Sequence, residues 1–401
     1  MPLRRFRRHM LIACPVALAP TYAVAQAAPA VDPAPADASI DARIRQQMAE
    51  GGIVGMAAAI ILDGKVAWRA GYGHANREAG TPFTPQTVMN IASISKTVTG
   101  AAMMRAVEQG QLSLDADIQA ALPFPLRNPH RPGQPITLRQ LATHTSGITD
   151  RPAVYLRGYH FGRDAPQPLG AFLAGYFVPG GDDYSVGNFL DVAPGSHREY
   201  SNIGAALAGL AVEHATGQSL DAYTRQHFFA PLGMTRTRWF MAGAPMDDHA
   251  TLYVSQDGMP LPIEPYGLVT WPDGGLRTSV DDLSRFFIAL LQGGEYAGTR
   301  VLSRESVREM LRLQFTTTHK PDNVDVAEKN SGLFWQTKFN TRYVGHGGGD
   351  PGVRTEMLAT PALDTGVIVF TNTSGDDSVK AYVAILDALW AHAETLRAGA
   401  P

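Results

Sequence analysis

A serine and a lysine three residues apart are the first side chains in the chain that could do chemistry together. Ser93-Ile94-Ser95-Lys96 opens a helix-like run, so Ser93 is expected at a helix N-terminus with Lys96 one turn later on the same face. There, free N–H groups and positive potential favour an oxyanion, and a partly desolvated lysine can have its pKa lowered enough to accept the serine proton. The alternative is an ordinary N-cap serine followed by a surface lysine.

A second element, Tyr200-Ser201-Asn202, follows Pro194-Gly195 and precedes a helix expected from about Ile203. A tyrosine hydroxyl can shuttle a proton to a leaving group, and an asparagine amide can orient a lysine and the substrate carbonyl. The alternative is a core tyrosine followed by a residue that merely caps the helix.

A third element is the glycine-rich run from Tyr343 to Gly349, just ahead of a strand expected from Arg354. Glycines allow a strand edge to approach bound substrate closely, although a plain flexible turn would look the same. Part of the run matches a dinucleotide-binding fingerprint by letter, but a strand and not a helix follows, so no nucleotide site is predicted. The substrate-binding candidates are Asn202, His346, Gly347, Gly348 and Gly349.

In this order and at these separations, the three elements resemble the serine β-lactamase and penicillin-binding-protein superfamily. The closer resemblance is to its class-C-like branch, which includes D-Ala-D-Ala carboxypeptidases, D-aminopeptidases and family VIII carboxylesterases. It covers residues 40–390 and includes the stretches Leu141–Gly147, Pro231–Met234 and Gly274–Leu276. The resemblance implies that Ser93 is acylated and that Lys96 and Tyr200 act as coupled general base and acid. It further implies an oxyanion hole formed by the N–H groups of Ser93 and Gly349.

One departure from that family bears on the substrate. His346 stands where β-lactamases of this branch usually have lysine, and Gly347 where many have threonine. A histidine is mostly neutral at pH 7 and does not replace an obligate cation for the carboxylate of a β-lactam. A carboxylesterase or amidase is therefore the first expectation, followed by a D-Ala-D-Ala carboxypeptidase or D-aminopeptidase and then a β-lactamase. The alternative from another class is a catalytically silent protein that binds a muropeptide or another ligand.

The elements that must position these residues come from both ends of the chain. A short helix is expected from Ile40, followed by a β-hairpin over residues 55–72 that turns at Asp63-Gly64. A second hairpin is expected over residues 354–371, and a final helix over residues 378–396, with Val379, Val383, Leu386 and Trp390 on one face. The predicted fold is α/β (α+β): one antiparallel sheet flanked by helices, with an inserted helical region. The predicted domains are a sheet lobe of residues 40–107 and 267–397 and a helical lobe of residues 108–266.

Composition excludes several classes of function. The 401 residues carry a net charge of only −3 with interspersed signs, so nucleic acid is an unexpected partner. Cys14 is the only cysteine, and no metal-binding spacing occurs among the twelve histidines, so neither a thiol nucleophile, a metal nor another cofactor is predicted. His144 is assigned a structural role. The loop from Arg151 to Asp191 is expected to shape the pocket.

The N-terminus has the pattern of an export signal. An arginine-rich start precedes an apolar run that ends in Ala23-Val24-Ala25, which predicts a signal peptide over residues 1–25. Residues 26–39 are expected to form a flexible linker. The mature protein is then predicted to be periplasmic or secreted without a stable membrane span, with lipidation of Cys14 as the weaker alternative. Its expected partner is a small ester, amide or peptide substrate, and its oligomeric state is left open.

Overall fold

The structure is a computed structural model, and it describes residues 39–243 and 246–399. The helices are α1 (Ile40–Glu50), α2 (Ser95–Glu108), α3 (Leu138–Ala142), α4 (Pro152–Leu156), α5 (Leu169–Phe177), α6 (Asn202–Thr216), α7 (Leu220–Thr224), α8 (Val280–Leu291), α9 (Arg304–Leu311) and α10 (Val379–Ala398). The strands are β1 (Gly55–Leu62), β2 (Lys65–Asn76), β3 (Thr81–Pro82), β4 (Met89–Asn90), β5 (Tyr159–Phe161), β6 (Leu252–Gln256), β7 (Met259–Ile263), β8 (Tyr266–Leu268), β9 (Arg277–Thr278), β10 (Glu295–Tyr296), β11 (Thr299–Arg300), β12 (Gln336–Lys338), β13 (Tyr343–Asp350), β14 (Val353–Ala359), β15 (Thr365–Thr371) and β16 (Thr373–Ser374).

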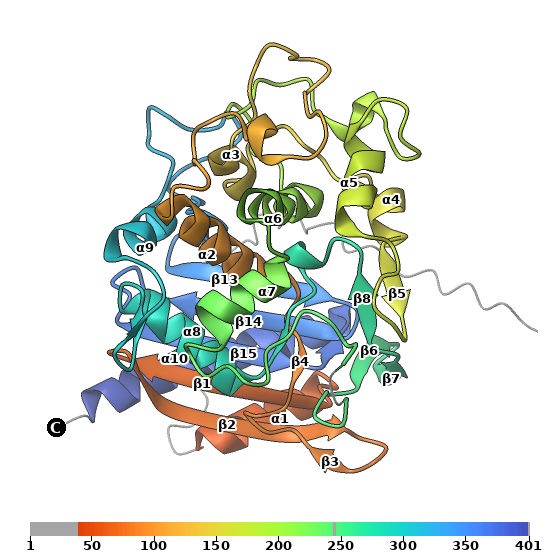
Figure 1. Cartoon of the computed structure of the whole chain (residues 1–401). Coiled ribbons are helices and arrows are strands. Elements are labelled where there is room, and N and C mark those ends of the chain that lie inside the picture. The colour runs from red at the N-terminus through yellow and green to blue at the C-terminus, as the bar shows by residue number, and fades with distance from the viewer. Residues whose placement is uncertain (1–38, 244–245, 400–401) are drawn as a thin grey trace, which may run out of the picture. The chain divides into compact units, whose positions relative to one another are not determined.

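The main sheet joins the two ends of the chain, as the sequence predicts. Its strand order is β12-β13-β14-β15-β1-β2-β3, and every pairing in it is antiparallel. Figure 1 shows the N-terminal strands β1 and β2 beside the C-terminal strands β14 and β15. The sequence of β1 is a continuous apolar run because this strand lies inside the sheet and is buried on both faces. The predicted fold class is confirmed.

Helices cover both faces of the sheet. Ala58 and Ile60 of β1 pack on one face with side chains of α1 and α10, while Ala57 and Ala59 belong to the larger core shared with α2 and α8. The predicted apolar face of α10 is partly wrong, because Val383 is 38% exposed. The buried side chains of this helix form a broader stripe that includes Tyr382, Ile385, Leu386, Leu389 and Trp390.

The middle of the chain contains the expected short helices and four strands that were not predicted. β5 pairs with β8, and β6 pairs with β7. β5 and β8 have three residues each, which is too short for an alternating pattern to be recognised.

The described residues belong to a single compact unit. The boundaries of the two predicted lobes stay a prediction.

Two predictions concern the N-terminus. The signal peptide and residues 26–38 of the linker lie outside the described residues. Of the helices in residues 39–243 and 246–399, none has both the length and the apolar character needed to cross a membrane.

Candidate active site

Ser93 lies in a tight turn that leads into α2. Residues 92–94 form a 3-10 turn, and Ala92 adopts a left-handed backbone conformation with φ of 48°. The Ser95 hydroxyl holds this turn, because it donates to the Ala92 carbonyl (2.6 Å) and accepts from the Leu276 N–H (3.1 Å). Ala92 and Ile94 are buried, but Ser93 keeps part of its surface exposed. The turn therefore presents the Ser93 side chain where a substrate can reach it.

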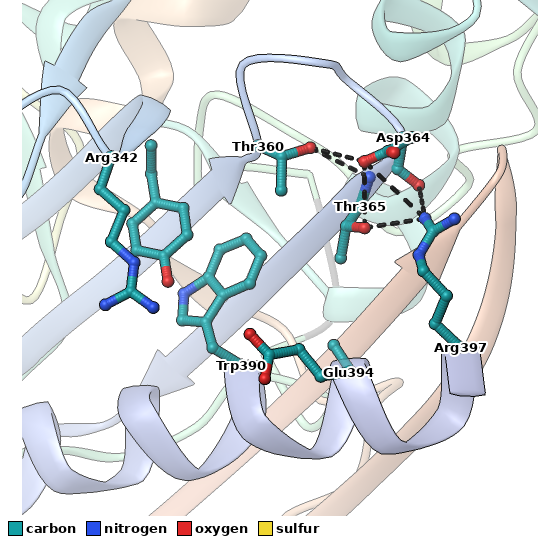
Figure 2. Close-up of a pocket in the computed structure, with 9 residues that line it drawn as sticks. Arg342, Thr360, Asp364, Thr365, Trp390, Glu394 and Arg397 are labelled. Atoms are coloured by element: carbon teal, nitrogen blue, oxygen red, sulfur yellow. Dashed lines mark hydrogen bonds and ion pairs between the residues drawn. The ribbon is translucent and has the colours of Figure 1, made fainter. Parts of the chain in front are cut away.

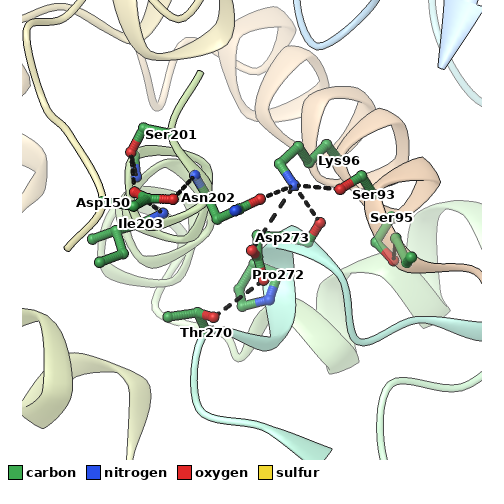
Figure 3. A network of polar contacts seen from close by, with 12 residues as sticks. Ser93, Ser95, Lys96, Asp150, Ser201, Asn202, Ile203, Thr270, Pro272 and Asp273 are labelled. Atoms are coloured by element: carbon green, nitrogen blue, oxygen red, sulfur yellow. Dashed lines mark hydrogen bonds and ion pairs between the residues drawn. The ribbon is translucent and has the colours of Figure 1, made fainter. Parts of the chain in front are cut away.

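Lys96 is fully buried one turn further along and points back at Ser93 (Figure 3). Its Nζ donates to Ser93 Oγ (3.0 Å), Asn202 Oδ1 (2.7 Å) and the main-chain oxygen of Asp273 (2.8 Å). Burial pulls the pKa of Lys96 down, but the opposing charges of Tyr200 and Asp273 outweigh it and raise the pKa above its ordinary value. Burial lowers this pKa as expected, but the neighbouring charges reverse the net direction, so the expectation of a lysine with a lowered pKa is wrong.

The Tyr200–Asn202 element lies at the start of α6 and meets α2. Ser201 is the N-cap and accepts from the Gly204 N–H (2.8 Å). The carboxylate of Asp150 accepts from Ser201 Oγ and the Asn202 N–H, each at 2.7 Å, which fixes the position of Asn202. The Tyr200 ring centroid lies 5.0 Å from Lys96 Nζ. The structure thus brings Ser93, Lys96, Tyr200 and Asn202 together.

His144 packs directly against this group. Its ring centroid is 4.3 Å from that of Tyr200, and its Nδ1 accepts from the Ser201 N–H (3.2 Å). Burial, reinforced by the charges of Arg198 and Lys96, lowers the pKa of His144 well below its usual value. A neutral histidine in this position supports the Tyr200 ring, which agrees with the structural role assigned to it.

The glycine-rich run is itself strand β13, an interior strand between β12 and β14. A side-chain carbon added to Gly348 would lie 2.4 Å from the Ile91 carbonyl oxygen, so this glycine lets β13 pack closely against the turn that carries Ser93. A carbon added to Gly349 would meet no atom within 4 Å. Gly349 therefore borders open space beside that turn.

His346 is 2% exposed, and its Nδ1 donates to the Gly347 carbonyl (2.7 Å). Burial, followed by the charge of Lys96, lowers the pKa of His346 well below its usual value. The histidine is neutral at pH 7, as its residue type suggested.

Two charged residues that the sequence analysis passed over also belong here. The carboxylate of Asp273 lies 3.9 Å from Lys96 Nζ, and both side chains are fully buried. Arg198 donates only to neutral partners, Ser331 Oγ (3.4 Å) and Gln336 Oε1 (3.3 Å), and forms no ion pair with a described residue. Gln336 of β12 pairs with Gly345 of β13, so the guanidinium lies at the β12 edge of β13, and its charge helps to lower the pKa of His346. Nothing in the local sequence distinguishes Asp273 from a turn residue. The only sequence signal for Arg198 was that a positive charge stands two positions before Tyr200.

A pocket of about 310 Å³ lies elsewhere, between α10 and the ends of β13 to β15 (Figure 2). Its wall includes Tyr343 and Trp390, which belong to the core on the α1 and α10 face of the sheet. Arg397 donates there to Thr365 Oγ1 (2.8 Å) and to the Asp364 carbonyl (2.9 Å). Thr360, Asp364, Thr365 and Arg397 hydrogen-bond to one another here, and the residues around Ser93 take no part in the pocket.

Comparison with known proteins gives the class that this fold and site define. The model of the Beta-lactamase family matches residues 40–389, so the chain belongs to this family of serine hydrolases. Among curated proteins, Protein flp of Staphylococcus aureus (strain N315) is 25% identical over 345 residues, which are 84% of this chain and 63% of the relative. The chain thus spans less than two thirds of that protein.

Two further proteins are similar to a part or to most of the chain. Esterase EstB of Burkholderia gladioli is 32% identical over 240 residues, which are 58% of each chain. The octameric penicillin-binding protein homologue from Pyrococcus abyssi is 28% identical with a TM-score of 0.68, and the match covers 88% of this chain and 77% of that one.

Proposed function

We propose that the protein is an exported serine hydrolase that cleaves ester, amide or peptide bonds through an acyl-enzyme. The observation that carries this proposal is the buried ammonium of Lys96, which donates to Ser93 Oγ at 3.0 Å and to Asn202 Oδ1 at 2.7 Å. Ser93 Oγ attacks the carbonyl carbon, and its proton passes through the coupled Lys96–Tyr200 unit to the leaving group. Water then attacks the acyl-enzyme and releases the acid, while Ser93 regains a proton.

The oxyanion is proposed to bind the N–H groups of Ser93 and Gly349. Two features support this assignment. The glycine at 348 allows β13 to pack against residues 91–92, and the space beside Gly349 is open. Donors held rigidly at such a position stabilise the charge that develops on the carbonyl oxygen.

A carboxylesterase or amidase is the first choice of activity. Neutral His346 supplies no cation for the carboxylate of a β-lactam, and the partial relative EstB is named as an esterase. A β-lactamase is accordingly the weakest of the three activities considered.

A D-Ala-D-Ala carboxypeptidase or D-aminopeptidase is the second choice, and Arg198 favours the carboxypeptidase. This guanidinium lies next to β13 without a carboxylate partner among the described residues, and a planar bidentate donor suits a terminal carboxylate. A peptide that ends in a free carboxylate would provide the missing partner.

Intact mass spectrometry of wild type and Ser93→Ala after exposure to a fluorophosphonate tests the acyl-enzyme. We expect one adduct on wild type and none on the variant. Turnover of p-nitrophenyl acetate, a D-Ala-D-Ala peptide and nitrocefin then ranks the three activities. A wild type that gains no adduct and turns over nothing would instead support the silent ligand-binding protein. The intact mass of protein recovered from the periplasm or medium shows whether residues 1–25 have been removed.

A further inference from the structure

A carboxylate lies beside Lys96 in the interior of the protein. Asp273 Oδ2 is 3.9 Å from Lys96 Nζ, and neither side chain has any exposed surface. The main-chain oxygen of the same aspartate accepts a hydrogen bond from Lys96 at 2.8 Å. Among the described residues, Lys96 has an ion pair with no other carboxylate within 4.0 Å. Asp273 therefore contacts the lysine through both its backbone and its side-chain charge (Figure 3).

The Asp273 carboxylate is held in place by hydroxyl groups and not by a second cation. Tyr155 of α4 donates to Oδ2 (2.7 Å), and Thr270 donates to Oδ1 (3.2 Å). Next to this pair, Tyr159 of β5 donates to Asp350 Oδ1 (2.5 Å) at the end of β13. Both tyrosines come from the stretch after Arg151 that was expected to shape the pocket. These hydroxyls satisfy the carboxylates and leave Lys96 as the positive charge that Asp273 faces.

We propose that Asp273 is a positioning residue that keeps Lys96 protonated while Ser93 is attacked. Lys96 then remains a hydrogen-bond donor to Ser93 Oγ, and the Tyr200 hydroxyl acts as a relay, because its oxygen takes the serine proton as its own proton passes to the leaving group. This inference rests on the proposed acyl-enzyme function and goes beyond it, since it gives Asp273, which lies in none of the three motifs, a role in keeping the charge on Lys96. A buried ammonium without a counter-charge would tend to lose its proton instead.

The expected sign follows from the charges around the lysine. Removing a negative charge 3.9 Å from Nζ destabilises the ammonium, so a rate that requires charged Lys96 falls off at a lower pH. The other titratable groups around this pair stay in place in the Asp273→Asn variant. They are Tyr200, Asp150, Asp350, Tyr155, Tyr159, His144, His346 and Arg198.

The experiment measures the rate at which a neutral fluorophosphonate labels Ser93 between pH 5 and 11 in the full protein. We expect the basic limb of the profile for Asp273→Asn to move to lower pH by about one unit or more, which is about a tenfold lower rate on that limb. Tyr155→Phe removes a hydrogen bond to Asp273 but keeps its charge, so its basic limb stays where it is in wild type. Asp221→Asn, at a half-buried carboxylate on α7 that is paired with Arg225, is the matched control for the amide substitution.

Lys96→Arg provides a second test that does not depend on the folding of the Asp273 variant. Arginine is a permanent cation, so we expect labelling faster than in Lys96→Met and a profile without a basic limb. The inference is overturned if Asp273→Asn keeps the wild-type basic limb, or if Lys96→Arg is no faster than Lys96→Met. Failure of the proposed function itself looks different, because wild type would then gain no adduct at any pH.

Discussion

The carboxyl group of Asp350 is expected to make the stability of this protein depend strongly on pH. It lies at the end of β13, where it accepts from Tyr159 and has the carboxylate of Asp273 nearby. Burial is the main cause that raises its pKa from 3.8 to about 7, with the charge of Asp273 adding to it. Asp350→Asn removes the titration, and the amide oxygen can still accept from the Tyr159 hydroxyl.

The magnitude follows from linkage. A group whose pKa is raised on folding stabilises fully below its unfolded pKa, and this contribution is lost as pH rises through the folded pKa. For Asp350 the loss therefore runs from pH 3.8 to about 7. The loss of stability between pH 5 and pH 7 covers two pH units. At about 1.4 kcal/mol per unit, it amounts to about 3 kcal/mol of unfolding free energy. Wild type should lose this amount on going to pH 8, and Asp350→Asn should not.

Urea denaturation of wild type and Asp350→Asn at pH 5 and pH 8 measures this difference directly. Any effect of the amide on packing is the same at both pH values and cancels when the two differences are compared. Asp364→Asn is the control, because a hydrogen bond from the Thr360 hydroxyl lowers the pKa of that carboxyl and its linkage falls below pH 5. The reasoning would be refuted if the unfolding free energies of Asp350→Asn and wild type differed by the same amount at pH 5 and at pH 8.

Two further predictions concern the strand and the cation beside Ser93. Gly348→Ala should destabilise the fold by about 1–3 kcal/mol in urea denaturation and slow labelling of Ser93, because the added methyl would lie 2.4 Å from the Ile91 carbonyl and from Thr355 Oγ1. Gly349→Ala, which meets open space, should stay within about 0.5 kcal/mol of wild type, and equal costs at both glycines would contradict this account. Arg198→Gln should raise KM at least tenfold for a peptide with a free C-terminal carboxylate while leaving KM for p-nitrophenyl acetate unchanged, and a parallel rise for both substrates would count against a carboxylate site.

The parts of the fold that could be predicted are those whose cause is local. The Asp63-Gly64 turn between two β-like runs was sufficient to predict the first hairpin, and β1 and β2 lie where it requires. The pairing of β1 with β15 followed from a general rule, since two exposed sheet edges from the chain ends are best buried against each other. β5 and β8 have no such local cause, because they pair across about a hundred residues and are three residues long.

In the active site, too, the residues that could be predicted are those whose arrangement has a local cause. The spacing of Ser93 and Lys96 follows from one helical turn, and the structure does bring Tyr200 and Asn202 to them. Asp273 could not be found in this way. In the sequence it stands before Gly274-Gly275 and has the composition of a surface turn. It becomes a buried neighbour of Lys96 only because residues 271–273 pack against α2.

The pKa of Lys96 explains why residue types alone cannot assign proton roles. From the sequence only burial could be anticipated, and burial by itself favours the neutral amine. The structure adds the opposing charges of Tyr200, Asp273 and Asp150, which come from three segments distant in sequence and reverse the sign. The charge of Asp273 is in turn set by its own surroundings, since burial raises the pKa of its carboxyl to about 6. The protonation state of the groups around Ser93 therefore depends on the whole cluster. Variants that change one charge but keep the shape of the side chain can separate the contributions of its members.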